Sequence, residues 1–338
     1  MSKPVVAGII SYGMSGRIFH APFLSTNQGF KLKAVVERHQ KKMVERYPDI
    51  VSYDTVDELL NDNEIELVVV NTPNFTHYDL AMQALNAGKH VLIEKPMAAN
   101  QHEIKQLFDL AKSKGVQVFA YQNRRWDSDF MAFKDIIDSG RLGRLTEVHL
   151  RYDRYKPILA LKPFKETADT PINGLVYDLA PHIIDQAIAL FGRPLSFDKI
   201  TARQRDNSVV VDYFNFRLSY PGELKVYLTG GLLIPDPLPS FIAHGTLGTF
   251  TKHRCDPQEA QLDKGMLPTN AAYGLEPEGC EGRLVTIGID DQKTIEMITS
   301  GRGNYMHLFD AVYHSIREGA KYPITEEHIS WQMEMAEA

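Results

Sequence analysis

The first 120 residues alternate between short apolar runs and longer segments whose apolar residues recur at helical spacing. A short apolar run bounded by turn residues is typical of a strand buried on both faces, and a 3.6-residue period is typical of an amphipathic helix. Strict alternation of the two predicts a doubly wound, parallel, Rossmann-like sheet. The predicted strands are 5–10, 32–37, 49–53, 65–71, 90–95 and 116–121, and the predicted helices are 17–24, 40–47, 55–61, 76–87 and 100–114. Thr55 is expected to cap the helix at 55–61, and Asn100, with Glu103 three residues later, is expected to cap the helix at 100–114.

The pattern changes near residue 121, and consecutive strands dominate the rest of the chain. Such runs predict an α+β domain with a large, mostly antiparallel sheet. We therefore expect two domains, 1–121 and 122–338, and we expect the uncovered face of the second sheet to pair with another subunit. The predicted strands are 145–154, 200–204, 211–220, 223–233, 241–245, 248–252, 284–288 and 293–298; helices are expected at 130–139, from about 178, at 305–318 and at 326–338, and loops at 157–171 and 256–282.

Composition narrows the classes of function. A chain of 338 residues is too long for one typical core, and 43% hydrophobic with 24% charged residues is ordinary for a globular protein. The net charge of −6 argues against a nucleic-acid or anionic-membrane partner. No apolar run approaches the roughly 20 residues of a membrane-spanning helix. The two cysteines, Cys255 and Cys280, show neither a metal-binding spacing nor a disulfide framework, so we expect a cytoplasmic protein without a metal.

The segment Glu94-Lys95-Pro96 contains the first candidate for chemistry. Pro96 cannot continue a strand ladder and holds Lys95 in an extended conformation, so Glu94 and Lys95 are expected at the carboxyl end of a central strand. Ligands of open α/β sheets bind at that edge. A lysine in this position is either a solvated surface charge or a proton donor in a cleft.

The first strand-to-helix turn has the spacing of a phosphate-binding loop, Gly13-x-x-Gly16, although Ser11 stands where the first glycine is usual. Gly13 would allow a pyrophosphate to approach the backbone, and Gly16 would allow close helix–sheet packing. Glu37 ends the second predicted strand, where an acid bonds the adenosine ribose. Arg38 follows and could meet a 2′-phosphate or stack on adenine. Glu37 favours NAD, and Arg38 leaves NADP open.

A second candidate group is Asp178, His182 and Asp185, whose spacing puts them on one face of a helix. Pro181 is tolerated only in a first helical turn, so this helix is expected to start close to Asp178, with Asp178 and His182 exposed and aimed the same way. The spacing alone also fits a structural histidine with a capping aspartate. Asp185, one turn deeper, is expected to orient the helix or His182.

Several stretches of the chain resemble the Gfo/Idh/MocA oxidoreductases, in the order of that family and over most of the chain. The pair formed by Glu94-Lys95-Pro96 and Asp178-x-x-x-His182 is quite specific for it. Phe19-His20-Ala21-Pro22 and Arg124-Arg125-Trp126-Asp127 resemble most closely the scyllo-inositol-dehydrogenase-like branch. Ser11 departs from the family pattern, as does Asn173-Gly174, where a run of glycines is common. The other matching stretches are 13–16, 71–74 with His77, 87–93, 121–123 and 177–186.

The resemblance implies hydride transfer from a secondary alcohol of a sugar or cyclic polyol to NAD or NADP. It implies that His182 is the general base, that Lys95 polarises the alcohol oxygen or relays its proton, and that Asp178 orients the substrate. It also implies a homodimer or homotetramer. Motif and resemblance together predict cofactor contacts from Ser11, Gly13, Ser15, Gly16, Phe19, Glu37, Arg38, Thr72, Pro73, Asn74, His77, Glu94, Lys95 and Gln122, and substrate contacts from Lys95, Arg124, Trp126, Tyr152, Tyr155, Asp178 and His182.

Two other classes of function stay open at this point. A cofactor-dependent sugar sensor binds without turnover and has no need of both Lys95 and His182. An NAD-dependent glycosidase oxidises its substrate transiently, eliminates and re-reduces, so it releases no net NADH. An absorbance screen with inositols and aldoses separates both classes from a dehydrogenase.

Overall fold

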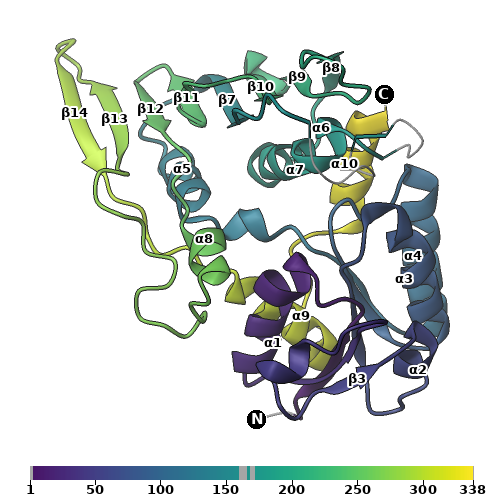
Figure 1. The fold of residues 1–338 in the computed structure, drawn as a ribbon. Coiled ribbons are helices and arrows are strands. Elements are labelled where there is room, and N and C mark those ends of the chain that lie inside the picture. The colour runs from purple at the N-terminus through teal and green to yellow at the C-terminus, as the bar shows by residue number, and fades with distance from the viewer. Residues whose placement is uncertain (1–2, 160–165, 168–171, 338) are drawn as a thin grey trace. The chain divides into compact units, whose positions relative to one another are not determined.

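The computed structural model describes residues 3–159, 166–167 and 172–337 (Figure 1). The chain forms two compact units, each with its own sheet. The first unit comprises Met1–Asn123, Gln258–Tyr273 and Asn304–Ser330, and the second comprises Arg124–Pro257, Gly274–Gly303 and Trp331–Ala338. The chain thus leaves the first unit after Asn123 and returns to it twice, through segments that the sequence pattern assigned to the second domain.

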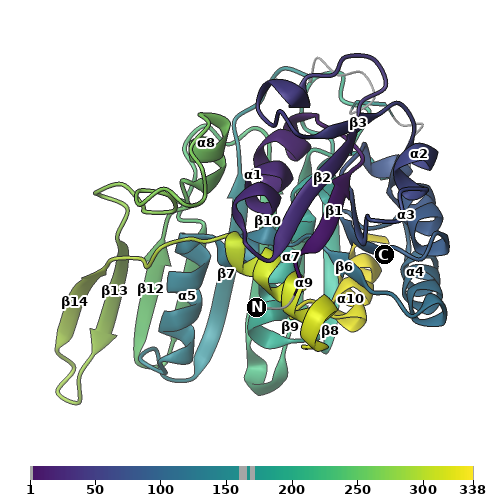
Figure 2. The same cartoon turned by 90° about the horizontal axis from the view of Figure 1, so that it is seen from below.

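The first unit is built on a six-stranded parallel sheet, which confirms the predicted Rossmann-like architecture. Its elements are β1 (Val5–Ile9), β2 (Phe30–Val36), β3 (Val51–Tyr53), β4 (Leu67–Val70), β5 (His90–Ile93), β6 (Val118–Ala120), α1 (Ala21–Thr26), α2 (Val56–Leu60), α3 (His77–Asn86), α4 (Gln101–Lys114), α8 (Gln258–Asp263) and α9 (Met306–Glu318). The strand order is β3-β2-β1-β4-β5-β6, and every neighbouring pair is parallel. Figures 1 and 2 show α3 and α4 on one face of this sheet and α1 and α9 on the other.

Local sequence explains where these elements begin. Every residue of β1 and of β4 is buried, as expected for central parallel strands. Thr55 caps α2: its hydroxyl accepts from the Glu58 N–H at 3.2 Å, and the Glu58 carboxylate accepts from the Thr55 N–H at 3.1 Å. Asn100 caps α4 by accepting from the Glu103 N–H at 2.9 Å. Both predicted caps are confirmed.

The second unit contains an eight-stranded, mostly antiparallel sheet, as predicted. Its elements are α5 (Ser128–Asp138), β7 (Leu145–Asp153), α6 (Leu175–Asp178), α7 (Ala180–Phe191), β8 (Ser196–Ala202), β9 (Tyr213–Ser219), β10 (Lys225–Gly231), β11 (Phe241–Gly245), β12 (Gly248–Lys252), β13 (Gly282–Ile287) and β14 (Lys293–Ile298); α10 (Glu326–Glu337) runs from one unit into the other. The strand order is β14-β13-β12-β11-β7-β10-β9-β8. Among the described strands of this sheet, β7 and β10 form the one parallel pair, and the other neighbouring pairs are antiparallel. Helices α5 and α7 cover one face (Figure 1).

Two predicted segments, 40–47 and 256–282, are wrong in detail. Residues 40–47 form only a short 3₁₀ turn, Met43–Glu45, because side chains tie this segment down: the Glu37 carboxylate accepts from the Lys42 and Met43 N–H groups, and the Lys41 ammonium donates to three backbone carbonyls. The predicted loop 256–282 contains α8.

No described helix has the length and apolar character needed to cross a membrane.

The helix predicted from Asp178 is two helices. Helix α6 ends at Asp178 and α7 begins at Ala180, because Pro181 lacks the N–H that a continuous helix requires. The two residues expected on one helix face therefore lie on different helices. Of the predicted loop 157–171, residues 160–165 and 168–171 lie outside the described residues.

Candidate functional site

The turn after β1 is closed by Ser11 and Asn71. The Ser11 hydroxyl accepts from the Gly13 N–H at 3.2 Å, so the serine at the usual glycine position itself shapes the turn. The Asn71 side chain follows β4; it accepts from the Ser11 N–H at 3.1 Å and donates to the Ser11 carbonyl at 2.7 Å. Asn71 was not among the predicted site residues, although its place directly after a buried strand is a usable signal.

Gly13 and Gly16 have different structural roles. A Cβ atom on Gly16 would lie 2.0 Å from the Ser11 carbonyl oxygen, which is backbone and cannot move aside cheaply. A Cβ on Gly13 would meet nothing nearer than the Ser11 hydroxyl, at 3.4 Å, and Gly13 is exposed. Gly16 is therefore required for packing, and Gly13 leaves room for a ligand to reach the backbone. Both properties fit a dinucleotide pyrophosphate.

Glu37 lies at the end of β2, but its carboxylate is turned toward the following turn. One oxygen accepts from the N–H groups of Lys42 and Met43 at 2.8 and 3.2 Å, and the other accepts from the Ser52 hydroxyl at 2.9 Å. Glu37 is only 8% exposed, whereas Arg38 is exposed. The side chain predicted to bond the ribose is thus already satisfied by three protein donors.

Glu94 is a buried carboxylate that directly follows β5. It accepts from the Ser15 hydroxyl at 2.5 Å and lies 2.9 Å from His20 Nε2. Burial by itself would raise the pKa of Glu94, but His20, Ser15 and the nearby Lys95 charge outweigh it and lower the pKa to about 2. The carboxylate therefore stays ionised and links the first turn to the strand that carries Lys95.

Glu94→Gln should destabilise the protein in a pH-dependent way. Since the folded-state pKa is about 2, against an ordinary value of 4.5, ionised Glu94 contributes up to about 3 kcal/mol of stability above pH 4.5, and this is lost as the pH falls toward 2. Urea unfolding of both proteins between pH 7 and pH 3 checks this result. A stability difference that stayed constant over this range would contradict the role given to the charge.

Lys95 is half-buried directly after β5, at the carboxyl edge of the sheet, and is followed by a cis peptide bond to Pro96. His77 holds this edge together: Nδ1 lies 2.7 Å from the Pro96 carbonyl and Nε2 lies 2.8 Å from the Thr72 carbonyl. Burial lowers the pKa of His77, although both carbonyls oppose the shift. His77 is 1% exposed, so it is placed to position the loops on either side of it.

The other predicted cofactor residues lie in the same unit, on loops that follow strands. Thr72 bonds Thr76 through their hydroxyls at 2.6 Å, and the Phe19 carbonyl accepts from the Tyr121 hydroxyl at 3.0 Å. Gln122 is buried after β6. Pro73 is exposed, and Phe19, Thr72 and Asn74 are half-buried. His20, which Glu94 contacts, was noticed in the sequence only as part of a family motif.

In the second unit, His182 lies in the first turn of α7 and is 6% exposed, whereas Asp178 is exposed at the end of α6. Asp185 is 2% exposed and forms a bidentate ion pair with Arg125, with both N–O distances 2.8 Å. Gln186 donates to the Arg124 carbonyl at 3.1 Å. These contacts bind α7 to the 124–126 segment, so Asp185 orients the helix as expected.

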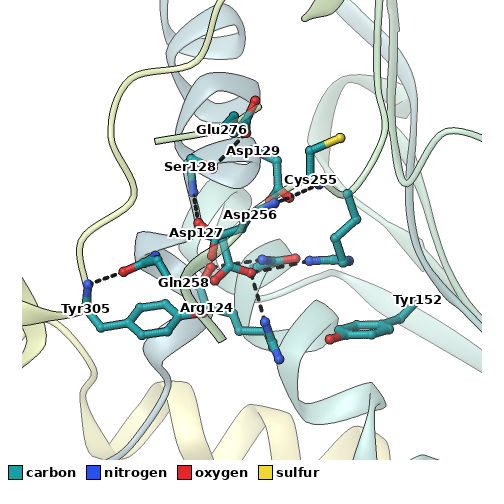
Figure 3. A network of polar contacts seen from close by, with 12 residues as sticks. Arg124, Asp127, Ser128, Asp129, Tyr152, Cys255, Asp256, Gln258, Glu276 and Tyr305 are labelled. Atoms are coloured by element: carbon teal, nitrogen blue, oxygen red, sulfur yellow. Dashed lines mark hydrogen bonds and ion pairs between the residues drawn. The ribbon is translucent and has the colours of Figure 1, made fainter. Parts of the chain in front are cut away.

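The predicted substrate residues Arg124 and Tyr152 come together in this unit (Figure 3). The Arg124 guanidinium carbon lies 5.5 Å from the Tyr152 ring centroid, and the Tyr152 and His182 rings are 6.0 Å apart. Trp126 is half-buried on the same segment as Arg124, but Tyr155 is 59% exposed. Asp127, which was noticed in the sequence only as part of a family motif and not as a site residue, is fully buried 3.4 Å from Arg124.

Comparisons with known proteins match both parts of the chain. A family model for oxidoreductases with an NAD-binding Rossmann fold, GFO/IDH/MocA, matches residues 5–122, and the model of the GFO/IDH/MocA C-terminal domain matches residues 130–251. The chain is 37% identical over 323 residues to scyllo-inositol 2-dehydrogenase (NADP(+)) IolW of Bacillus subtilis, covering 96% of this chain and 89% of that protein.

Solved structures agree with this match. The structure of yvaA from Bacillus subtilis superposes with a TM-score of 0.93 at 35% identity, covering 99% of this chain and 94% of that one. A protein from Bacteroides fragilis superposes with a TM-score of 0.90 at 36% identity, covering 99% and 96%.

Proposed function

Because the chain belongs to the GFO/IDH/MocA family of oxidoreductases, we propose that it oxidises a secondary alcohol of a sugar or cyclic polyol. The cofactor is NAD or NADP, whose nicotinamide accepts the hydride. The observation that carries the proposal is the half-buried Lys95 at the carboxyl edge of the parallel sheet, next to a buried, ionised Glu94. The relative named as a scyllo-inositol 2-dehydrogenase supports the choice of an alcohol substrate.

The proposed chemistry needs two groups at one oxygen. His182 accepts the hydroxyl proton as the carbon–hydrogen bond breaks, acting as the general base. Lys95 donates a hydrogen bond to the same oxygen and stabilises the negative charge that develops there. The Glu94 carboxylate accepts from the Lys95 N–H at 3.3 Å and so helps to position this residue, and Asp178 orients a neighbouring hydroxyl of the substrate.

An absorbance screen with inositols and aldoses, run separately with NAD and NADP, tests the proposed function. We expect a steady increase at the reduced-nicotinamide band with at least one polyol. Cleavage of a glycoside of these sugars, with no net reduced cofactor, would instead support a glycosidase. Binding without either signal, measured by calorimetry, would support a sensor and overturn the proposal.

We also propose that NADP is the preferred cofactor. Glu37 would favour NAD only if its carboxylate were available to the ribose, and three protein donors already engage it. The exposed Arg38 follows at the end of the same strand, where a guanidinium pairs with a 2′-phosphate. The relative from Bacillus subtilis is named as an NADP(+) enzyme, which agrees with this preference.

Arg38→Ala should weaken NADP binding at least tenfold, since a charge-assisted bond to phosphate is worth about 1.5–3 kcal/mol. NAD binding should change by less than about twofold. Isothermal titration with each cofactor measures both values. Lys31→Ala is a control with the same loss of charge, because Lys31 is exposed near the opposite end of β2. Equal losses for NAD and NADP in Arg38→Ala would contradict the assignment.

The open face of the second sheet supports a further proposal, that the protein forms a homodimer or homotetramer. Ile200, Ile295 and Met297 on the outer strands are 62%, 55% and 57% exposed, which is unusual for apolar side chains of a sheet. Sedimentation velocity at micromolar concentration should give a dimer or larger species. A monomer under those conditions would exclude this assembly.

A further inference from the structure

Three arginine side chains surround Tyr152 in the second unit. Tyr152 is 5% exposed, and the guanidinium carbons of Arg254, Arg154 and Arg124 lie 4.3, 5.0 and 5.5 Å from its ring centroid. One guanidinium over a tyrosine ring is a common packing arrangement. Three on one buried ring repel one another, so the cluster is stabilised by any negative charge that lies within its reach.

Asp127 supplies part of that negative charge. Its carboxylate lies 3.4 Å from Arg124 and 3.5 Å from Arg254. Burial raises the pKa of Asp127 well above its ordinary value, and the nearby Asp256 carboxylate adds to this increase. One carboxylate whose charge is disfavoured therefore lies between two guanidinium groups (Figure 3 shows it beside Arg124).

Arg254 has a structural explanation. Its guanidinium also lies 4.8 Å from the Phe241 ring centroid, and it donates to the Arg151 carbonyl at 3.3 Å. It is thus held between two aromatic rings, a carboxylate and a backbone acceptor. Packing and hydrogen bonding account for this side chain without a ligand.

Arg154 has no comparable explanation. Its backbone is fixed beyond β7: its N–H donates to the Gly231 carbonyl at 2.9 Å, and its carbonyl accepts from the Ile234 N–H at 3.1 Å. Its half-buried side chain donates only to the Tyr152 hydroxyl, at 3.3 Å, and no acidic oxygen of the described residues lies within 4.0 Å of its guanidinium nitrogens. The positively charged Arg154 guanidinium is therefore held beside the Tyr152 ring, which also lies near the His182 ring.

We propose that Arg154 binds an anionic group of the substrate, so that the preferred substrate is an acidic or phosphorylated polyol. This inference rests on the proposed function, because it places the anion near His182, whose ring is 6.0 Å from that of Tyr152. Guanidinium groups only donate hydrogen bonds, and their planar fork matches the paired oxygens of carboxylate and phosphate. A neutral polyol would gain less here, because its hydroxyl groups carry no charge to oppose the Arg154 guanidinium.

Matched substrates test the inference. Glucose, glucuronate and glucose 6-phosphate differ only at C6, and inositol can be compared with an inositol monophosphate. We expect kcat/KM for an acidic substrate to exceed that of its neutral counterpart at least tenfold. Comparing glucuronate with glucose 6-phosphate shows whether the preferred anion is a carboxylate or a phosphate. Arg154→Gln should lower the acidic value 10- to 100-fold through KM and lower the neutral value much less, so that the preference for the acid is lost. Arg154→Lys should restore part of the loss.

Arg217→Gln is the matched control, since Arg217 lies on β9 in the same unit and pairs with Asp198 at 2.5 Å. Equal losses in Arg217→Gln and Arg154→Gln would show a general charge effect and overturn the inference. Turnover of neutral members with no preference for acids would overturn it while the dehydrogenase proposal stands. If no member is turned over, the dehydrogenase proposal fails. Calorimetric binding of glucuronate and glucose 6-phosphate to the wild type and to Arg154→Gln then decides the inference. Loss of binding in the variant supports the inference, and binding that is unchanged in the variant or absent from both proteins overturns it.

Discussion

His182→Ala and Lys95→Ala are each expected to lower the rate of the chemical step by about two to four orders of magnitude, the usual contribution of general acid–base groups. The loss should appear in kcat, because each group acts mainly on the charge that develops in the transition state. Cofactor affinity should barely change in His182→Ala, since His182 belongs to the second unit and the cofactor-binding turn belongs to the first. Single-turnover absorbance kinetics at saturating substrate measure the step directly.

The double variant provides a stricter test. If Lys95 and His182 act on one oxygen, removing both should cost much less than the product of the single effects, because groups that act as a unit are not additive. His149→Ala is the matched control: this histidine stacks on Tyr227 with ring centroids 5.0 Å apart and has no proposed role in catalysis. A wild-type rate for His182→Ala would identify His182 as a structural histidine.

Gly13→Ala and Gly16→Ala are expected to separate cofactor binding from folding. Gly16→Ala places a methyl group 2.0 Å from the Ser11 carbonyl oxygen, so the variant should lose about 2–4 kcal/mol of unfolding free energy. Gly13→Ala meets nothing closer than 3.4 Å and should keep the wild-type stability. It should nevertheless bind NAD and NADP at least tenfold more weakly, because the methyl group occupies the space that a pyrophosphate needs.

Thermal unfolding and isothermal titration on the same samples check this pair. The two variants differ in position by three residues and in nothing else, so each is the control for the other. Unchanged cofactor affinity in a stable Gly13→Ala would exclude this turn as the phosphate-binding loop. Unchanged stability in Gly16→Ala would show that the turn can relax around a methyl group.

The sequence by itself determined the features that depend on short-range physics. Burial of apolar runs and helical spacing predicted the alternating strands and helices of the first sheet, and side-chain capping predicted the starts of α2 at Thr55 and of α4 at Asn100. Lys95 could be assigned to a strand end because Pro96 restricts its own neighbour. In each case the residues that decide the structure lie within a few positions of one another.

Only the tertiary structure decided features that depend on residues far apart in the chain. Residues 40–47 have a helical pattern, but the Glu37 carboxylate and the Lys41 ammonium use their hydrogen bonds to hold a turn instead. Segment 304–330 follows the strands of the second sheet in sequence, yet α9 packs on α1, with Phe309 stacked on Phe23 at a centroid distance of 5.0 Å. No local pattern records which distant surface an apolar helix face will cover.

The same physical reason separates the predicted from the unpredicted site residues. Gly13, Lys95 and His182 belong to motifs whose spacing can be recognised within one segment of the chain. The bond from Ser15 to Glu94 spans 79 positions, and Arg124 and Arg254, which both lie beside the Tyr152 ring, are 130 positions apart in the chain. Contacts of that kind are set by the strand order of each sheet, which brings the ends of non-consecutive strands together, and strand order depends on the packing of the whole unit.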